Sequence, residues 1–306
     1  MTATLAYSLV SKWYGNVLGV SQIDLEIGPG VLGLLGINGA GKSTLMKMAA
    51  GLLKPSLGTV RVLGGNPRTE TKVRKHIGYC PEIDRFYENM RVESWILGMA
   101  RYFGYPKKQA QELTSQVLER VGMIENRKKK LSECSKGMRQ RTKLARAMLG
   151  QPGLYLLDEP LTGLDPLARH DIVHLVQELG RQGNTVIVSS HVLEEVEQMT
   201  NQLVLIHQGR LMARGSISEI RDQIQDQPRK MAIGCEHPRR LGKELLSLPS
   251  VEGVEVSDKA LKVRVLEASA FFQALTKLAA EPGMGVQSLV PLDEGLDAVF
   301  GYLVNQ

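Results

Sequence analysis

Residues 36–44, which read GINGAGKST, constrain the fold of this chain more than any other segment. They follow a short apolar run, VLGLLG, and precede a stretch with helical periodicity. The glycines Gly36, Gly39 and Gly41 allow backbone angles that turn successive N–H groups toward an anion. The start of the following helix adds its partial positive charge. This order of strand, glycine-rich loop and helix predicts a phosphate-binding P-loop.

Within this loop, we expect Lys42 to bridge the β- and γ-phosphates of a nucleotide and the Ser43 hydroxyl to ligate Mg²⁺. A glycine-rich turn before a helix is the alternative, and the flanking strand and helix weigh against it. The candidate nucleotide-binding residues of the loop are Gly36, Ile37, Asn38, Gly39, Ala40, Gly41, Lys42, Ser43 and Thr44.

Two adjacent carboxylates end a second apolar run, LYLLD at residues 154–158. Carboxylates at the end of a buried strand are costly unless water, a metal ion or a partner meets them. Asp158 therefore fits a Mg²⁺ site, and Glu159 fits a base that polarises an attacking water. The alternative is an acid pair in a loop before the proline turn.

Strand-like and helix-like segments alternate over residues 1–218, which predicts a mostly parallel sheet with helices on both faces. A helical subdomain at about 88–150 interrupts this α/β pattern. Within it, a helix is expected at 140–149. The expected strands of this part lie at 5–10, 21–27, 31–36, 59–64, 76–80, 154–158, 185–190 and 203–209.

The pattern changes after about residue 218. The order strand, helix, strand, strand, helix, strand predicts a small α+β, ferredoxin-like domain over residues 219–306. A final helix is expected at 294–304, and the linker between the domains near 223–230. We expect this second domain to be accessory or regulatory.

Cysteine spacing and hydropathy bear on the compartment. Cys80, Cys134 and Cys235 lie far apart without a CxxC pair, which argues against a disulfide framework or a zinc site. No run reaches the ~18 apolar residues of a membrane helix, and the N-terminus lacks the pattern of a secretion signal. We therefore expect a cytosolic chain whose role at a membrane would come through a partner.

Charge is concentrated in residues 101–150, where 13 Lys/Arg face 4 Glu, a net charge of +9. Such a window suits nucleic acid, anionic lipid or a phosphate ligand, but the run RKKK at 127–130 is better explained as a solvated helical face. Aromatic residues do not alternate with these charges, so nucleic acid is not the expected partner.

The segment SKGMRQRTKLARAMLGQPGLYLLDEP, residues 135–160, resembles the ATP-binding subunits of ABC transporters, and the likeness extends over residues 5–214. In that family a Leu-Ser-Gly-Gly-Gln signature, followed by Arg-Gln-Arg, lies a fixed distance before the strand that ends in the acid pair. That spacing gives Ser135 the serine position and Gly137 that of the second glycine, whereas Ser132 is three residues too early. Lys136 and Met138 depart from the pattern.

The resemblance implies roles for these four positions. In the family the signature contacts the γ-phosphate of ATP that a second subunit holds, and a serine at a helix start suits an anion. The predicted trans ATP-binding residues are Ser135, Lys136, Gly137 and Met138. Lys136 either adds positive charge near that phosphate or points to solvent.

Three further positions match the family one by one, and a fourth, Glu82, departs from it. Tyr14 resembles the aromatic residue that stacks on adenine, with a packing tyrosine as the alternative. Asp165 resembles an aspartate of the dimer interface, and His191 the histidine that contacts the γ-phosphate and the attacking water. Glu82 stands where the family usually has glutamine. Its carboxylate would ligate Mg²⁺ more strongly and add negative charge to the catalytic site.

The resemblance implies an ATP hydrolase that binds ATP and Mg²⁺ and energises a membrane transporter, in the exporter-type, ABC-2-like branch. Its expected partners are a second copy or a paralogous ATPase subunit, together with a separate multi-span membrane permease. Through the permease the chain would lie on the inner face of the cell membrane. The alternatives are a soluble ABC ATPase acting on nucleic acid or ribosomes, and a binding module that does not hydrolyse ATP.

Overall fold

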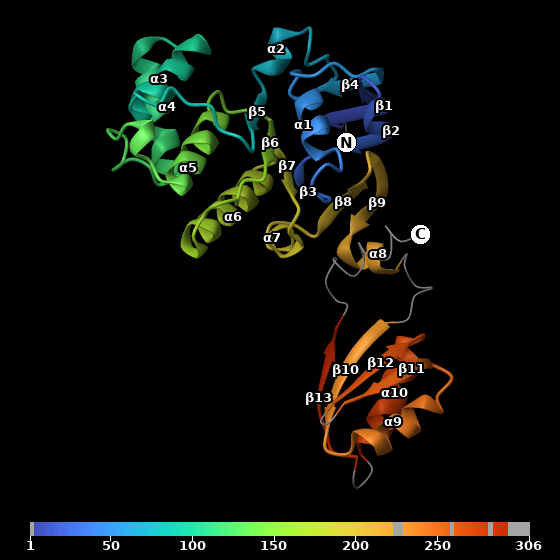
Figure 1. The fold of residues 1–306 in the computed structure, drawn as a ribbon. Helices are drawn as coiled ribbons and strands as arrows, with labels where there is room; N and C mark the ends of the chain where they lie inside the picture. Colours follow the sequence, from blue (N-terminus) through green and yellow to red (C-terminus); the bar gives the residue numbers. More distant parts are fainter. Residues whose placement is uncertain (1–2, 223–228, 258–259, 281–283, 293–306) are drawn as a thin grey trace. The chain divides into compact units, whose positions relative to one another are not determined.

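The computed structural model describes residues 3–222, 229–257, 260–280 and 284–292. The chain divides into two compact units, residues 1–217 and 218–306. The first unit contains a six-stranded sheet, a three-stranded sheet and their helices, and the second contains a four-stranded sheet (Figure 1).

The six-stranded sheet is the frame of the first unit, with strand order β5-β6-β7-β3-β8-β9. Neighbouring strands are parallel, apart from β9, which pairs antiparallel with β8 at one edge. Both β6 and β7 are buried throughout, as parallel strands covered on two faces must be. The predicted mostly parallel sheet is confirmed. Its strands are β3 (Gly30–Leu35), β5 (Ile77–Cys80), β6 (Leu154–Asp158), β7 (Thr185–Ser190), β8 (Gln202–His207) and β9 (Arg210–Ser216).

The early strands form a separate antiparallel sheet. Strand β1 (Leu5–Tyr14) lies between β2 (Val17–Ile27) and β4 (Leu57–Val62). The strand character of these segments follows from the sequence, but their association into a second sheet depends on pairing over long distances in the chain. Their buried side chains share one core with helix α1 and with the inner strands of the larger sheet.

Helices of the first unit contribute to two hydrophobic cores. Helices α3, α4 and α5 lie together on one side of the unit (Figure 1) and share a core with β6, β7 and α6. Helix α5 begins four residues earlier than expected because Ser135 caps its start. None of the described helices has the length and apolarity to cross a membrane. The helices of residues 1–222, of which α8 begins at the boundary between the units, are α1 (Lys42–Ala49), α2 (Thr71–Arg74), α3 (Val92–Tyr102), α4 (Lys107–Arg120), α5 (Lys136–Ala147), α6 (Pro166–Arg181), α7 (Leu193–Glu197) and α8 (Ile217–Asp222), with a 3₁₀ turn η1 (Leu131–Glu133).

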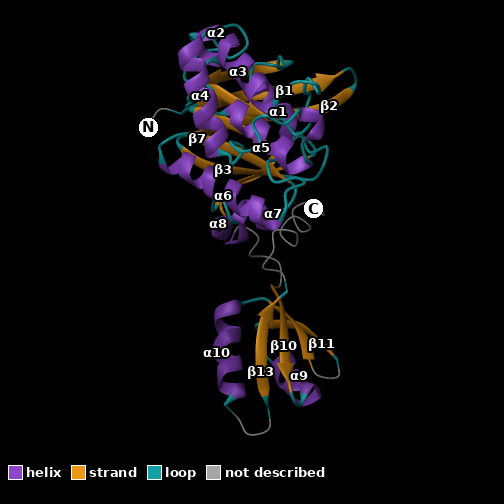
Figure 2. Ribbon diagram, turned by 90° about the vertical axis from the view of Figure 1, so that its left-hand side faces the viewer, coloured by secondary structure: helices purple, strands orange, loops and turns teal. Residues whose placement is uncertain are grey.

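The second unit has the strand order β11-β12-β10-β13, with every neighbouring pair antiparallel. This is the arrangement of a split βαβ fold, which the sequence predicts. Side chains of α9 and α10 share one core with the sheet, and Figure 2 shows α10 alongside it. The helix expected at 294–304 and most of the expected linker lie outside the described residues. The elements are β10 (Arg229–Cys235), α9 (Pro238–Leu246), β11 (Val251–Val256), β12 (Ala260–Val265), α10 (Ala268–Ala279) and β13 (Val286–Pro291).

Candidate active site

The glycine-rich loop connects the carboxyl end of β3 to the first residue of α1, as predicted. A side chain at Gly36 would place its Cβ 2.4 Å from the carbonyl oxygen of Ile206, so only glycine fits there. Gly41 precedes α1 with φ of 111°, a backbone angle that glycine adopts without strain. Of the remaining loop residues, Ala40 is buried, Ile37, Asn38 and Gly39 are exposed, and Ser43 and Thr44 are half-buried in α1.

Lys42 is the buried cation of this loop, with only 6% of its side chain exposed. Its Nζ donates to the carbonyl oxygens of Gly36 at 2.5 Å and Ile37 at 3.3 Å, and lies 3.7 Å from Glu159 Oε1. Burial lowers the pKa of Lys42, and the nearby carboxylates of Glu159 and Asp158 partly oppose that shift. The folded chain thus holds this ammonium group in place before any ligand arrives.

Glu159 joins Lys42 to His191. Its Oε2 lies 3.0 Å from His191 Nδ1, and because an ionised carboxylate only accepts hydrogen bonds, His191 donates through Nδ1. Burial raises the pKa of Glu159, while the hydrogen bond from His191 and the charge of Lys42 lower it. The backbone of Glu159 has φ of 50°, an unusual angle for a glutamate and one that is found at functional sites. A carboxylate with a raised pKa is suited to act as a base.

Ser189 orients this acid pair and was missed by the sequence analysis. Its hydroxyl donates to Asp158 Oδ1 at 2.6 Å and accepts from the backbone N–H of Glu159 at 3.0 Å. Register accounts for the contact, because Asp158 on β6 is the direct neighbour of Ser189 on β7. A small polar residue at the end of an apolar strand was the available signal.

The charges around Lys42 fit a divalent cation. The carboxylates of Glu82, Asp158 and Glu159 all act on the ammonium of Lys42, so negative charge is in excess there. In the part of the chain that the structure describes, no three His, Cys, Asp or Glu side chains form a metal site alone. Mg²⁺ needs no such set, since it keeps several waters and takes phosphate oxygens as ligands.

Tyr14 lies at the end of β1 beside the same loop. Its ring is 46% exposed, and its hydroxyl lies 3.3 Å from Thr44 Oγ1. The Lys12 ammonium lies 5.4 Å from the ring centroid. An exposed aromatic ring next to a phosphate-binding loop can stack on a base.

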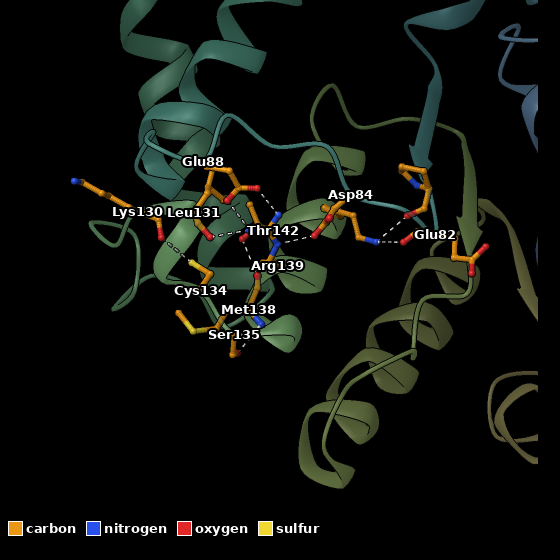
Figure 3. Close-up of polar contacts among 12 residues, drawn as sticks. Glu82, Asp84, Glu88, Lys130, Leu131, Cys134, Ser135, Met138, Arg139 and Thr142 are labelled. Atoms are coloured by element: carbon orange, nitrogen blue, oxygen red, sulfur yellow. Dashed lines mark hydrogen bonds and ion pairs between the residues drawn. The ribbon is translucent and has the colours of Figure 1, made fainter.

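Ser135 starts α5 away from this cluster. Its Oγ accepts from the backbone N–H of Met138 at 3.2 Å (Figure 3), which caps the helix. Gly137 lies in the first turn of the helix, and the Met138 side chain packs on the core. Among the described residues, no hydrogen bond or ion pair connects Ser135 or Lys136 with Lys42 or Glu159.

The exposed Lys136 side chain lies with its stem over Gly163. A Cβ placed on Gly163 would lie 2.4 Å from Lys136 Cδ and 2.5 Å from its Cε, so the stem of the lysine covers Gly163. Gly163 is in the turn before Asp165, whose carboxylate accepts from the Ala168 N–H at 2.9 Å and caps α6. The stem of Lys136 therefore joins the starts of α5 and α6.

A comparison with family models identifies an ABC transporter domain at residues 20–162. Over 268 residues the chain is 36% identical to the Nod factor export ATP-binding protein I of Rhizobium etli, which covers 85% of this chain and 82% of that protein. It is 30% identical to the bacitracin transport ATP-binding protein BcrA of Bacillus licheniformis, covering 100% of this chain and 98% of that one.

A solved ATP-binding subunit of an ABC transporter has the same fold. It superposes with a TM-score of 0.66 at 28% sequence identity, over 72% of this chain and 92% of that structure. The identities and the coverage, together with the loop at Lys42 and the acid pair at the end of β6, establish the family. This chain belongs to the ATP-binding, ATP-hydrolysing subunits of ABC transporters.

Proposed function

We propose that two copies of this chain enclose two ATP molecules. Each ATP is bound by the Lys42 loop of one copy, and the Ser135 region of the other copy completes its binding site. The observation that carries the proposal is the division of the site within one chain. Lys42, Glu159 and His191 form one connected cluster, whereas among the described residues no hydrogen bond or ion pair joins Ser135 or Lys136 to it.

The Lys42 side binds the nucleotide. Backbone N–H groups of the loop would hold the phosphates, and the Lys42 ammonium would move from the Gly36 and Ile37 carbonyls to the β- and γ-phosphate oxygens. The Tyr14 ring would stack on the base, since its hydroxyl contact with Thr44 keeps it beside the loop.

Mg²⁺ would be held by the Ser43 hydroxyl, Asp158 and Glu82. When bound, it offsets the charge of the phosphates and of the carboxylates near Lys42. Hard oxygen donors suit this ion, and the hydrogen bond from Ser189 already orients the Asp158 carboxylate.

Glu159 would accept a proton from the attacking water as the water oxygen bonds to the γ-phosphorus and the bond from phosphorus to the leaving oxygen of ADP breaks. His191 keeps the Glu159 carboxylate oriented through its Nδ1–H, and it is 46% exposed, so its ring is accessible to the γ-phosphate. The products are ADP and inorganic phosphate.

A surface groove beside the helical group suits the membrane permease. It has a volume of about 330 Å³ and is lined by apolar residues with Arg74, Lys75 and Arg146 at its walls. Tyr102 and Leu52, which also line it, are 88% and 63% exposed. We propose that a cytoplasmic segment of a multi-span permease occupies this groove and holds the chain on the inner face of the membrane.

The relatives favour export as the direction of transport, because one is a Nod factor export protein and another a bacitracin transport protein. We assign this chain to an ABC-2-like exporter on that likeness. We also assign residues 219–306 an accessory role in dimer support or regulation. Deletion of these residues is then expected to weaken ATP-dependent dimerisation.

The test of the site is Glu159→Gln in the full chain. The amide keeps the shape of the side chain but cannot accept the proton, so hydrolysis should fall by about 10²-fold or more. Mg²⁺–ATP should trap this variant as a dimer in light scattering. Glu194→Gln, an exposed carboxylate on α7, is the control and should leave turnover unchanged. A Glu159→Gln protein that stays monomeric with Mg²⁺–ATP would contradict the shared site.

A further inference from the structure

Helix α5 joins Ser135 to the segment that carries Glu82. Arg139 and Lys143 follow Ser135 at steps of four residues, so the three lie along one side of the helix. Both longer side chains contact the 81–88 segment after β5 (Figure 3). Lys143 Nζ donates to the backbone oxygens of Pro81 at 2.8 Å and Glu82 at 2.6 Å.

Arg139 makes the larger set of contacts. Its Nε donates to Asp84 Oδ2 at 2.7 Å, and its Nη1 and Nη2 donate to the two carboxylate oxygens of Glu88 at 2.8 and 2.7 Å. Nη1 also donates to the carbonyl oxygen of Leu131 at 3.0 Å. The Phe86 ring lies 4.9 Å from the guanidinium carbon.

This geometry requires arginine. The guanidinium is a planar fork that meets one carboxylate with two parallel bonds while its Nε serves another, which the single ammonium of lysine cannot do. Only 20% of the Arg139 side chain is exposed, so these charge-assisted bonds are partly shielded from water. The segment 84–88 is therefore fixed to α5 one turn after Ser135.

We propose that Arg139 is a positioning residue that makes the Glu82 segment and the Ser135 turn move as one body. The inference rests on the proposed two-copy site. Glu82 would meet the Mg²⁺ of the ATP bound to its own chain, while Ser135 meets the ATP of the other copy. Binding of ATP near Glu82 is then transmitted along α5 to the Ser135 turn, which contacts the ATP of the other copy. Arg139 therefore affects dimerisation without contacting ATP.

The experiment uses the full chain in the Glu159→Gln background, with two measurements. One is the affinity for a fluorescent ATP analogue at a protein concentration too low for dimers. The other is the ATP concentration for half-maximal dimerisation by light scattering. Arg139→Ala should raise the ATP concentration for half-maximal dimerisation by about tenfold, the effect of losing a charge-assisted hydrogen bond. The affinity of the single chain for the ATP analogue should be unchanged. Arg139→Lys should recover little of the loss.

Arg127→Ala is the matched control, because Arg127, in the turn region after α4, pairs with Glu93 of α3, and no hydrogen bond or ion pair between described residues joins its side chain to the 81–88 segment. If Arg139→Ala behaves like Arg127→Ala, or loses affinity for the analogue as much as dimerisation, the inference is wrong. Should Arg139→Ala not fold, Glu88→Gln decides, since it removes one charge at a half-exposed site and should shift only dimerisation. A Glu159→Gln background that does not dimerise contradicts the proposed function instead.

Discussion

The Lys42 loop and the Ser135 turn differ in how much of their surroundings one chain supplies. Lys42 is 6% exposed and has two carbonyl oxygens and a carboxylate within reach. Ser135 is exposed, and among the described residues its hydroxyl oxygen accepts one hydrogen bond, from a backbone N–H of its own helix. Contacts within one chain organise the first region, whereas the second is an exposed surface, which we propose is completed by a second copy. Loss of a side chain should therefore have different consequences at the two places.

The largest effect is expected at the buried region. Lys42→Ala removes the only cation that the loop holds near Glu159 and should weaken ATP binding about 10³-fold, as the loss of charge-assisted bonds at a shielded site implies. Titration with a fluorescent ATP analogue measures this. Lys47→Ala is the control, since Lys47 lies on the same helix but is exposed. Equal affinity in the two variants would place the nucleotide elsewhere.

A smaller effect, of a different kind, is expected at the exposed region. Ser135→Ala should leave the affinity of a single chain for ATP unchanged and raise the ATP concentration needed for dimerisation by about tenfold, because it removes a helix cap and the hydroxyl that we propose faces the ATP of the other copy. Light scattering in the Glu159→Gln background measures it. Ser132→Ala provides the comparison, as another exposed serine three residues earlier. Similar losses in both serine variants would remove the special role of Ser135.

The two regions were also not equally predictable from the sequence. The loop at 36–44 and the acid pair at 158–159 are local patterns, and the structure has them at the ends of β3 and β6 as the apolar runs indicate. The contacts of Arg139 with Asp84 and Glu88 span about fifty residues of chain, and no spacing of residues in the sequence predicts them. The same holds for Ser189, which reaches Asp158 only through strand register.

Long-range pairing also limits the prediction of the fold. The strands β1, β2 and β4 were expected as strands, but their separate sheet was not, because alternation of apolar residues shows which face is buried and not which strand lies alongside. Lys136 shows the same limit for a single side chain. The sequence leaves its direction open, and in the structure its stem lies over Gly163, 27 residues away.

The smallest effect, a shift along the pH axis, separates the two regions by their electrostatics. Burial raises the pKa of Glu159 above the ordinary 4.5 of a glutamate, so the acid limb of kcat should lie above that value, with the rate rising as the carboxyl group loses its proton. The hydrogen bond from His191 lowers this pKa. His191→Ala should therefore move the acid limb to higher pH, whatever it does to the plateau rate. Profiles of kcat against pH, each scaled to its own plateau, measure the shift.

Ser135→Ala supplies the control for this shift. In the part of the chain that the structure describes, no hydrogen bond or ion pair joins Ser135 to Glu159, so loss of the Ser135 hydroxyl should reduce dimerisation and leave the acid limb in place. An acid limb that moves to lower pH in His191→Ala would mean that the imidazole does not donate to Glu159 in the working enzyme. Equal movement in Ser135→Ala would mean that the two regions are electrostatically one site already within a single chain, and the contrast between them would no longer hold.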